Sequence, residues 1–295
     1  MKGGQGGFGG GGGGGLLSSS SNGIPGQGGF GGGVGGYSGE TRTTGNIGVG
    51  GGYSRGGGGG GAAFGGAIFV NTGSLTFAGT ELNIDQPVNA VVGGSGGAGS
   101  GPALSGFNGF AAGESIFALQ NLIFSPSSSL SNVFTVSGSI ADGSLASVPA
   151  TGTSTPGSGS GIQLIKNNSG TLILEGINTY SGGTTINQGP LSLQGANGQL
   201  LSTGFVNITA SAGNASFDIS SSGLSNQVIG DLSGGSNALI LLGTNQLTFG
   251  TNNTVAQTYA GTIRTTSTSG ALSKQGTGTE IFSGASGLFT GTANI

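Results

Sequence analysis

The stretch that decides the fold runs from Leu164 to Leu193 and reads LIKNNSGTLILEGINTYSGGTTINQGPLSL. Short apolar alternations within it, such as Leu172/Leu174 and Leu191/Leu193, are separated by Gly, Asn, Ser and Thr. Alternation with a period of two predicts a strand with one buried face. The separating residues are typical of tight turns. The stretch therefore predicts several short strands in succession and no helix.

Similar apolar runs continue on both sides of this stretch. On the N-terminal side we expect strands in 67–70, 75–77, 81–84, 116–119, 122–124 and 133–136. From residue 162 onward we expect strands centred on Leu164, Leu172/Leu174, Ile186, Leu191/Leu193, Val206/Ile208, Phe217/Ile219, Ile229/Leu232, Leu239/Leu241, Leu247/Phe249, Ile263 and Leu272. Short strands at such regular spacing occur in sandwiches, barrels and solenoids.

An internal repeat favours the solenoid among these three. Residues 164–172, LIKNNSGTL, are echoed farther along the chain by residues 272–280, LSKQGTGTE. Internal repetition is the mark of stacked supersecondary units. The second copy stops at Ile295, in the middle of the repeat, so we expect the chain to be a fragment.

Composition excludes several classes of function. The chain has 295 residues, of which 73 are Gly, and it contains no His, Cys or Trp. This removes His-based acid–base catalysis, His or Cys metal ligands, disulfides and Cys nucleophiles. Six basic and nine acidic residues give a net charge of −3, which argues against a nucleic-acid partner. We assign no catalytic, cofactor-binding or metal-binding residue and no cofactor.

Three regions follow from the distribution of glycine. Residues 1–60 are a Gly-rich, low-complexity tract, which we expect to be disordered because ordering so much glycine is entropically costly. Residues 61–161 contain irregular β segments with Gly/Ser loops, one of them running from Gly93 to Gly109. Residues 162–295 carry the regular strands. Neither a signal peptide nor a membrane helix is visible in the sequence.

The repeat resembles the autotransporter-associated β-strand repeat, over 162–204 and, truncated, over 271–295. The matching positions are Lys166, Gly170, Thr171, Leu172, Leu174, Gly176, Asn178, Thr179, Tyr180, Gly182, Gly183, Thr184 and Thr185. The first copy departs from the family pattern at Asn168, where the family has Gly, and at Pro190. The second copy departs at Glu280, where the family has Leu.

The resemblance implies an all-β fold, a right-handed parallel β-helix that serves as the passenger of a type V-secreted bacterial surface protein. It implies an extracellular location at the cell surface, associated with the outer membrane in the full-length parent. A separate C-terminal translocator barrel is expected in the parent and absent from this chain. The expected role is that of a non-catalytic stalk or adhesive surface, with ligands on host or neighbouring cells as partners.

Two alternatives from other classes remain open. Parallel β-helices also form polysaccharide-acting enzymes, which need paired acids. Asp218 and Asp231 are close enough in sequence to lie on adjacent strands as such a pair. The other alternative is a Gly-rich extracellular matrix protein with no stable fold before residue 160. Lys166 and Lys274, which are equivalent in the repeat, are interpreted as turn residues and not as a ligand row.

Overall fold

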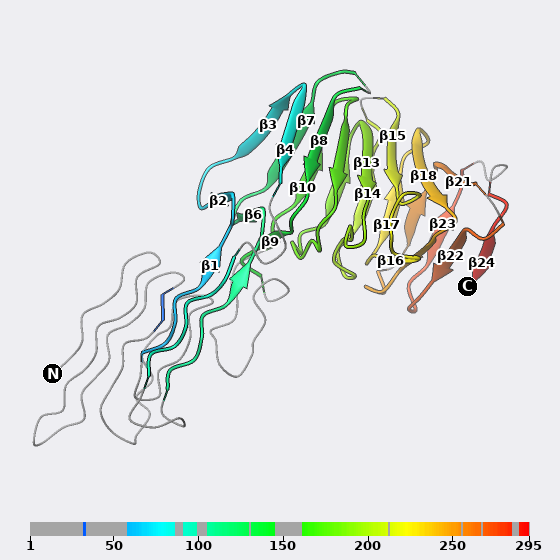
Figure 1. Cartoon of the computed structure of the whole chain (residues 1–295). Helices are drawn as coiled ribbons and strands as arrows, with labels where there is room; N and C mark the ends of the chain where they lie inside the picture. Colours follow the sequence, from blue (N-terminus) through cyan, green and yellow to red (C-terminus); the bar gives the residue numbers. More distant parts are fainter. Residues whose placement is uncertain are drawn as a thin grey trace, which may run out of the picture. The chain divides into compact units, whose positions relative to one another are not determined.

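The computed structural model describes ten segments of the chain (Figure 1), namely residues 32–33, 58–85, 91–98, 105–129, 131–144, 161–211, 213–254, 256–266, 268–284 and 289–294. Most of the Gly-rich tract 1–60, and Ile295, lie outside them. The described residues belong to two compact units. One falls within 1–69, 88–117 and 141–160, and the other within 70–87, 118–140 and 161–295. None of the described residues forms a helix that could cross a membrane.

The second unit is a parallel β-solenoid built from three sheets, in which strands of successive coils lie side by side (Figure 1). The first sheet contains, in spatial order, β23 (Glu280–Phe282), β20 (Gln257–Tyr259), β17 (Leu232–Gly234), β14 (Val206–Ile208), β12 (Thr184–Ile186), β10 (Leu164–Lys166), β7 (Leu122–Pro126) and β3 (Leu75–Gly79). The second contains β21 (Thr262–Thr265), β18 (Ala238–Gly243), β15 (Ala215–Asp218), β13 (Gly189–Leu193), β11 (Thr171–Leu174), β8 (Val133–Val136) and β4 (Glu81–Ile84). The third contains β16 (Asn226–Val228), β19 (Gln246–Phe249), β22 (Ala271–Lys274) and β24 (Thr292–Asn294). The prediction of an all-β parallel solenoid is confirmed.

Inward-facing side chains form ladders along the solenoid. In the second sheet the parallel register aligns Leu82, Phe134, Leu172, Leu191, Phe217, Ile240 and Ile263. In the first sheet it aligns Phe77, Phe124, Lys166, Ile186, Ile208, Gly234, Tyr259 and Phe282. Each ladder residue removes apolar surface from water by covering the one below it, so each coil depends on its neighbours for stability.

Two members interrupt the apolar ladder of the first sheet. Lys166 lies between Phe124 and Ile186, and it is fully buried. Gly234 faces the ring of Tyr259, and a Cβ at Gly234 would come within 2.7 Å of that ring. The missing side chain therefore makes room for a large one in the next coil.

The two copies of the sequence repeat begin on different faces of the solenoid. Lys166 ends β10 in the first sheet, and Lys274 ends β22 in the third. The repeat is thus a local strand–turn–strand unit that is not tied to one face. The two copies begin on different sheets because the coils between them differ in length. For example, the coil that brings Val206 beside Leu232 is longer than the one that brings Leu164 beside Thr184.

The first unit has few regular strands. β1 (Ala63–Phe64) pairs in parallel with β5 (Ala111–Ala112). β2 (Ile68–Val70), β6 (Ile116–Ala118) and β9 (Ile140–Asp142) form a three-stranded sheet. Phe117 stacks on Phe64, with ring centroids 4.2 Å apart, and on Phe69 at 5.6 Å.

Three glycine-rich segments of this unit are joined by backbone hydrogen bonds at every third residue. Between the first two segments, Gly94 donates to Gly61 and Gly97 to Gly58. Between the second and third, Gly106 donates to Gly97 and Gly109 to Gly94. Between the first and third, Gly60 donates to Phe107 and Ala63 to Phe110. A period of three is that of a polyproline-II-type helix, which has no internal hydrogen bonds and so bonds to its neighbours.

Glycine is required where these segments approach one another. A Cβ at Gly60 would lie 1.8 Å from the carbonyl oxygen of Gly94, and one at Gly96 would lie 1.9 Å from that of Gly106. Gly33 is equally close to Gly59, at 2.1 Å. The segment from Gly93 to Gly109, expected to be a loop, is therefore packed and hydrogen-bonded in its described parts.

Candidate functional site

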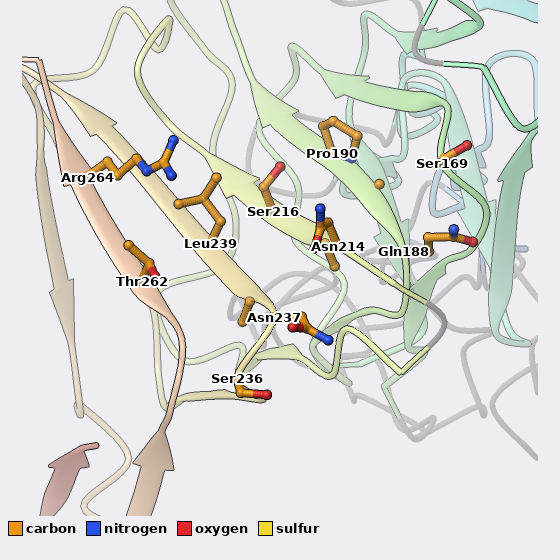
Figure 2. A pocket seen from close by; sticks show the side chains of 13 residues that line it. Ser169, Gln188, Pro190, Asn214, Ser216, Ser236, Asn237, Leu239, Thr262 and Arg264 are labelled. Carbon is orange, nitrogen blue, oxygen red and sulfur yellow. The ribbon is translucent and has the colours of Figure 1, made fainter. Parts of the chain in front are cut away.

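A polar groove crosses the outer face of the second sheet (Figure 2). It has a volume of about 610 Å³ and passes over the first residues of β13, β15, β18 and β21. The lining residues are Ser169, Gln188, Gly189, Pro190, Asn214, Ala215, Ser216, Ser236, Asn237, Ala238, Leu239, Thr262 and Arg264.

The floor of the groove follows from strand alternation. Pro190, Ser216, Leu239 and Thr262 are aligned by the parallel register. Each immediately precedes a residue of the inward ladder, so each faces outward. The rim comes from the turns that lead into these strands. Figure 2 shows Gln188, Asn214 and Asn237 on that side and Arg264 on the other.

The polar side chains of the groove have unused hydrogen-bonding capacity. Within the described part of the chain, none of the eight makes a side-chain hydrogen bond; they are those of Ser169, Gln188, Asn214, Ser216, Ser236, Asn237, Thr262 and Arg264. Together they offer amides, hydroxyls and one guanidinium, which are donors and acceptors of several kinds.

Two polar rows elsewhere on the solenoid differ, because their side chains bond to one another. In the turns after β10, β12 and β14, the amide nitrogen of Asn187 donates to Asn167 at 2.9 Å and Thr209 donates to Asn187 at 2.7 Å. On the third sheet, Thr248 donates to Asn226 at 2.9 Å. These rows stabilise the stacking of coils. The groove is therefore unlike these outward rows in leaving its polar groups available.

The charge of the groove is set by Arg264. This residue is exposed on β21, and no Asp or Glu is among the described lining residues. A guanidinium presents a planar fork of donors that matches a carboxylate. The groove combines this single positive charge with neutral polar groups.

The repeat residues, by contrast, are used in holding the coils together. Nζ of Lys166 donates to the carbonyl oxygens of Asn167 at 2.8 Å and Asn168 at 2.6 Å, and to that of Gln188 in the next coil at 2.9 Å. Burial lowers the pKa of Lys166 to about 7. Lys274 repeats the first two contacts, with Gln275 and Gly276. Both lysines thus bind the carbonyls of their own turn.

Asn178 joins three coils. Its side-chain nitrogen donates to Gly176 and, in the next coil, to Gln199, both at 2.9 Å. Its side-chain oxygen accepts from the amide of Ile140 in the preceding coil at 3.0 Å. Tyr180 is buried as well, and its hydroxyl is hydrogen-bonded to Thr184 at 2.7 Å. Burial raises the pKa of Tyr180 above the usual range of a tyrosine.

Asp218 and Asp231 do not share a sheet. Asp218 ends β15 in the second sheet, where its carboxylate accepts from the amide of Ser220 at 2.8 Å. Asp231 directly precedes β17 in the first sheet. Asp231 affects the pKa of a different acid, Glu280. Burial is the larger cause and the negative charge of Asp231 the smaller one, and together they raise the pKa of Glu280 to about 7. The positive charge of Lys274 acts in the opposite direction. Sequence spacing could not reveal this relationship, because the two residues lie in different coils.

A second, apolar cavity of about 450 Å³ lies where the inward ladders end. It is lined by the last ladder residues Ile263, Phe282 and Ala293, and by Lys274 and Glu280. Phe282 and its neighbour Ile281 are both 46% exposed. One side-chain oxygen of Glu280 is buried there without a hydrogen-bond partner. Among the described residues, no group of three or more Asp or Glu side chains is arranged to hold a metal ion.

Comparison with known proteins identifies the repeats. Residues 164–197 and 272–295 match the passenger-associated-transport-repeat family. Searches of curated proteins and of solved structures gave no match. The two matched segments are those expected from the sequence, and in the first of them the buried side chains of Lys166 and Asn178 form hydrogen bonds between coils. The chain therefore carries two passenger-associated-transport repeats, and these repeats indicate an autotransporter passenger domain with an extracellular or cell-surface location.

Proposed function

We propose that the chain is a non-catalytic passenger segment, a stalk that also presents an adhesive surface outside the cell. Its partners would be ligands on host cells or on neighbouring cells. The proposal rests on one observation, which is that buried and exposed polar residues have different hydrogen-bond partners. The buried side chains of Lys166 and Asn178 bind backbone groups of the solenoid, whereas eight polar side chains that make no side-chain hydrogen bond in the described part of the chain line one groove on its outside.

A stalk needs stiffness along its axis, and the ladders supply it. The inward ladder of the second sheet runs through seven strands without a polar residue, from Leu82 to Ile263. Contacts such as that between Lys166 and Gln188 add hydrogen bonds between coils. A structure in which every coil binds its neighbours resists local opening except near its ends.

The non-catalytic part of the proposal rests on the placement of the acids. Asp218, on β15 of the second sheet, and Asp231, directly before β17 of the first, are the pair considered for glycoside chemistry, and they do not share a sheet. Hydrolysis of a glycosidic bond requires two carboxylates on either side of that bond. The described lining of the groove contributes none.

Surface labelling of cells that produce the full-length parent protein tests the location. We expect an antibody against the solenoid to label intact cells, and external protease to remove the label. Adhesion is tested by coating beads with the chain and counting those retained on cell layers. A reducing-end assay against a panel of polysaccharides, with Asp218→Asn as the comparison, tests for turnover. Unlabelled intact cells or turnover abolished by Asp218→Asn would refute the proposal.

A further inference from the structure

We infer that the groove on the second sheet binds an acidic oligosaccharide, with a sugar carboxylate on Arg264 and sugar hydroxyls on the amides and hydroxyls of the floor and rim. The inference rests on the proposed adhesive function and adds the class of ligand. It starts from the eight unpaired polar side chains in a groove of about 610 Å³.

The chemistry of the lining matches hydroxyl groups. A sugar hydroxyl both donates and accepts, and the side chains of Asn, Gln, Ser and Thr do the same. Gln188, Asn214 and Asn237 each directly precede one of the aligned residues Gly189, Ala215 and Ala238 of three successive coils, so amide side chains are repeated along the groove at the spacing of strands, about 4.8 Å. Four strands cross the floor, which gives a path of about 14 Å for an elongated ligand.

The charge of the lining favours an acid over a neutral sugar. Arg264 is exposed and has no ion-pair partner in the described part of the chain. No carboxylate of the described lining would repel an anion. A charge-assisted bond between guanidinium and carboxylate is about twice as strong as a neutral hydrogen bond. A single cation suits one carboxylate and not the repeated phosphates of a nucleic acid.

The floor argues against a peptide as the ligand. Extended peptides commonly bind by adding a strand to the free edge of a sheet, through main-chain hydrogen bonds. The groove lies on the face of the sheet, where β13, β15 and β18 are each paired on both edges and β21, the last strand of the sheet, is paired with β18. Only side chains are offered to a ligand there, and Leu239 and Pro190 supply small apolar contacts for a sugar ring.

Calorimetric titration of the whole chain with oligogalacturonate, and with a neutral galactan oligomer of the same length, tests the inference. We expect the acidic ligand to bind more tightly, and the difference to shrink at high salt because the added affinity is electrostatic. Arg264→Gln should weaken binding of the acidic oligomer about tenfold or more and leave the neutral one unchanged. Ser216→Val and Asn237→Ala should weaken both.

Thr258→Val is the matched control, because Thr258 is exposed on β20 of the first sheet and does not line the groove. It should bind as the unaltered chain does. Circular dichroism of each variant verifies that the solenoid is retained. Equal affinity for the two sugars, an unchanged affinity in Arg264→Gln, or tighter binding of an oligoglutamate peptide would each overturn the inference. If these results appear while intact cells are still labelled, the sugar ligand is wrong and the surface location stands.

Discussion

Asn168 and Gly276 occupy equivalent positions of the two repeats and share a left-handed backbone, with φ of 60° and 70°. Each follows the lysine by two positions, and its carbonyl oxygen accepts from that lysine. Glycine adopts this conformation without strain, and asparagine tolerates it better than most residues. The position at which the first repeat departs from the family pattern thus keeps the backbone that the pattern requires.

Asn168→Gly should leave stability nearly unchanged, whereas Asn168→Val should lower the free energy of unfolding by about 1–2 kcal/mol, the cost of a left-handed residue with a Cβ branch. Urea unfolding followed by circular dichroism measures both. Ser169→Ala, in the same turn, is the control and should be close to neutral. Equal midpoints for the Gly and Val variants would contradict the conformational argument.

Lys166→Met should destabilise the solenoid by about 1–3 kcal/mol, because three carbonyl oxygens lose their donor. Removing the buried charge offsets part of this cost. Lys274→Met is the matched variant and should cost less, since Lys274 is only partly buried and donates to two carbonyls. The comparison requires the two melting temperatures, and a larger loss for Lys274→Met would show that the contact with Gln188 contributes nothing.

Stability should pass through a minimum near pH 7. The raised pKa of Glu280, about 7, means that the folded state binds more protons than the unfolded state above pH 4.5, so stability falls as the pH rises from 4.5 to 7. The lowered pKa of Lys166, also about 7, means that the folded state binds fewer protons below pH 10.5, so stability rises between pH 7 and 10.5. Urea midpoints across this range give the profile. Glu280→Gln should remove the acidic limb and retain the basic one, and a profile unchanged by this substitution would refute the assignment.

Gly234→Ala should destabilise the first sheet by about 1–3 kcal/mol, because the new Cβ would meet the ring of Tyr259 at 2.7 Å. Tyr259→Leu should cost stability by itself, through the loss of buried ring area and of the hydrogen bond from its hydroxyl to Thr262. The double variant should be more stable than the sum of the two losses predicts. A double-mutant cycle by urea unfolding provides the measurement, and strict additivity would mean that the two positions do not interact.

Gly60→Ala should open the glycine-rich segments of the first unit and leave the solenoid folded. Its Cβ would lie 1.8 Å from the carbonyl oxygen of Gly94, a distance that no rotation of a side chain relieves. Gly94→Ala is the milder comparison, because its nearest contact would be 3.1 Å. Amide hydrogen exchange of Gly97 and Gly109 reports on the segments, and the solenoid amides serve as the internal reference. Protection retained in Gly60→Ala would contradict the close packing.

Sequence reasoning predicted most strands of the solenoid because each is encoded locally, by alternation such as that of Leu172 and Leu174. It also located both repeats. It missed β20, β23 and β24, and it was wrong to place Ile229 and Leu232 in one strand, because β16 ends at Val228 in the third sheet and β17 begins at Leu232 in the first. It could not predict that Lys166 faces inward, since a lysine at the end of an apolar strand is compatible with either face until the position of the turn carbonyls is known. The close packing around Gly60 could not be predicted either, because a run of glycines has the same sequence whether it packs closely or forms a loop.

The groove could not be predicted from the sequence, for a different reason. Its residues come from several separate places between Ser169 and Arg264, and variable coil length decides which of them align. Individually, Asn214 and Ser236 resemble ordinary turn residues. Their common feature, an absence of side-chain partners, becomes visible only when the register of β13, β15, β18 and β21 is known.

The two repeats begin on different sheets, and this arrangement has a consequence for recombination within the gene. Recombination between the two copies would delete the chain between them and join the turn after Lys166 to the residues that now follow Lys274. The downstream strands would then leave from the first sheet instead of the third, so each would shift to another side of the solenoid. Such an event would also remove β13, β15, β18 and β21, and the groove with them. A single step would thus change the length of the solenoid and remove the groove, while Gln275 and Gly276, which now accept from Lys274, would follow Lys166 in the joined turn.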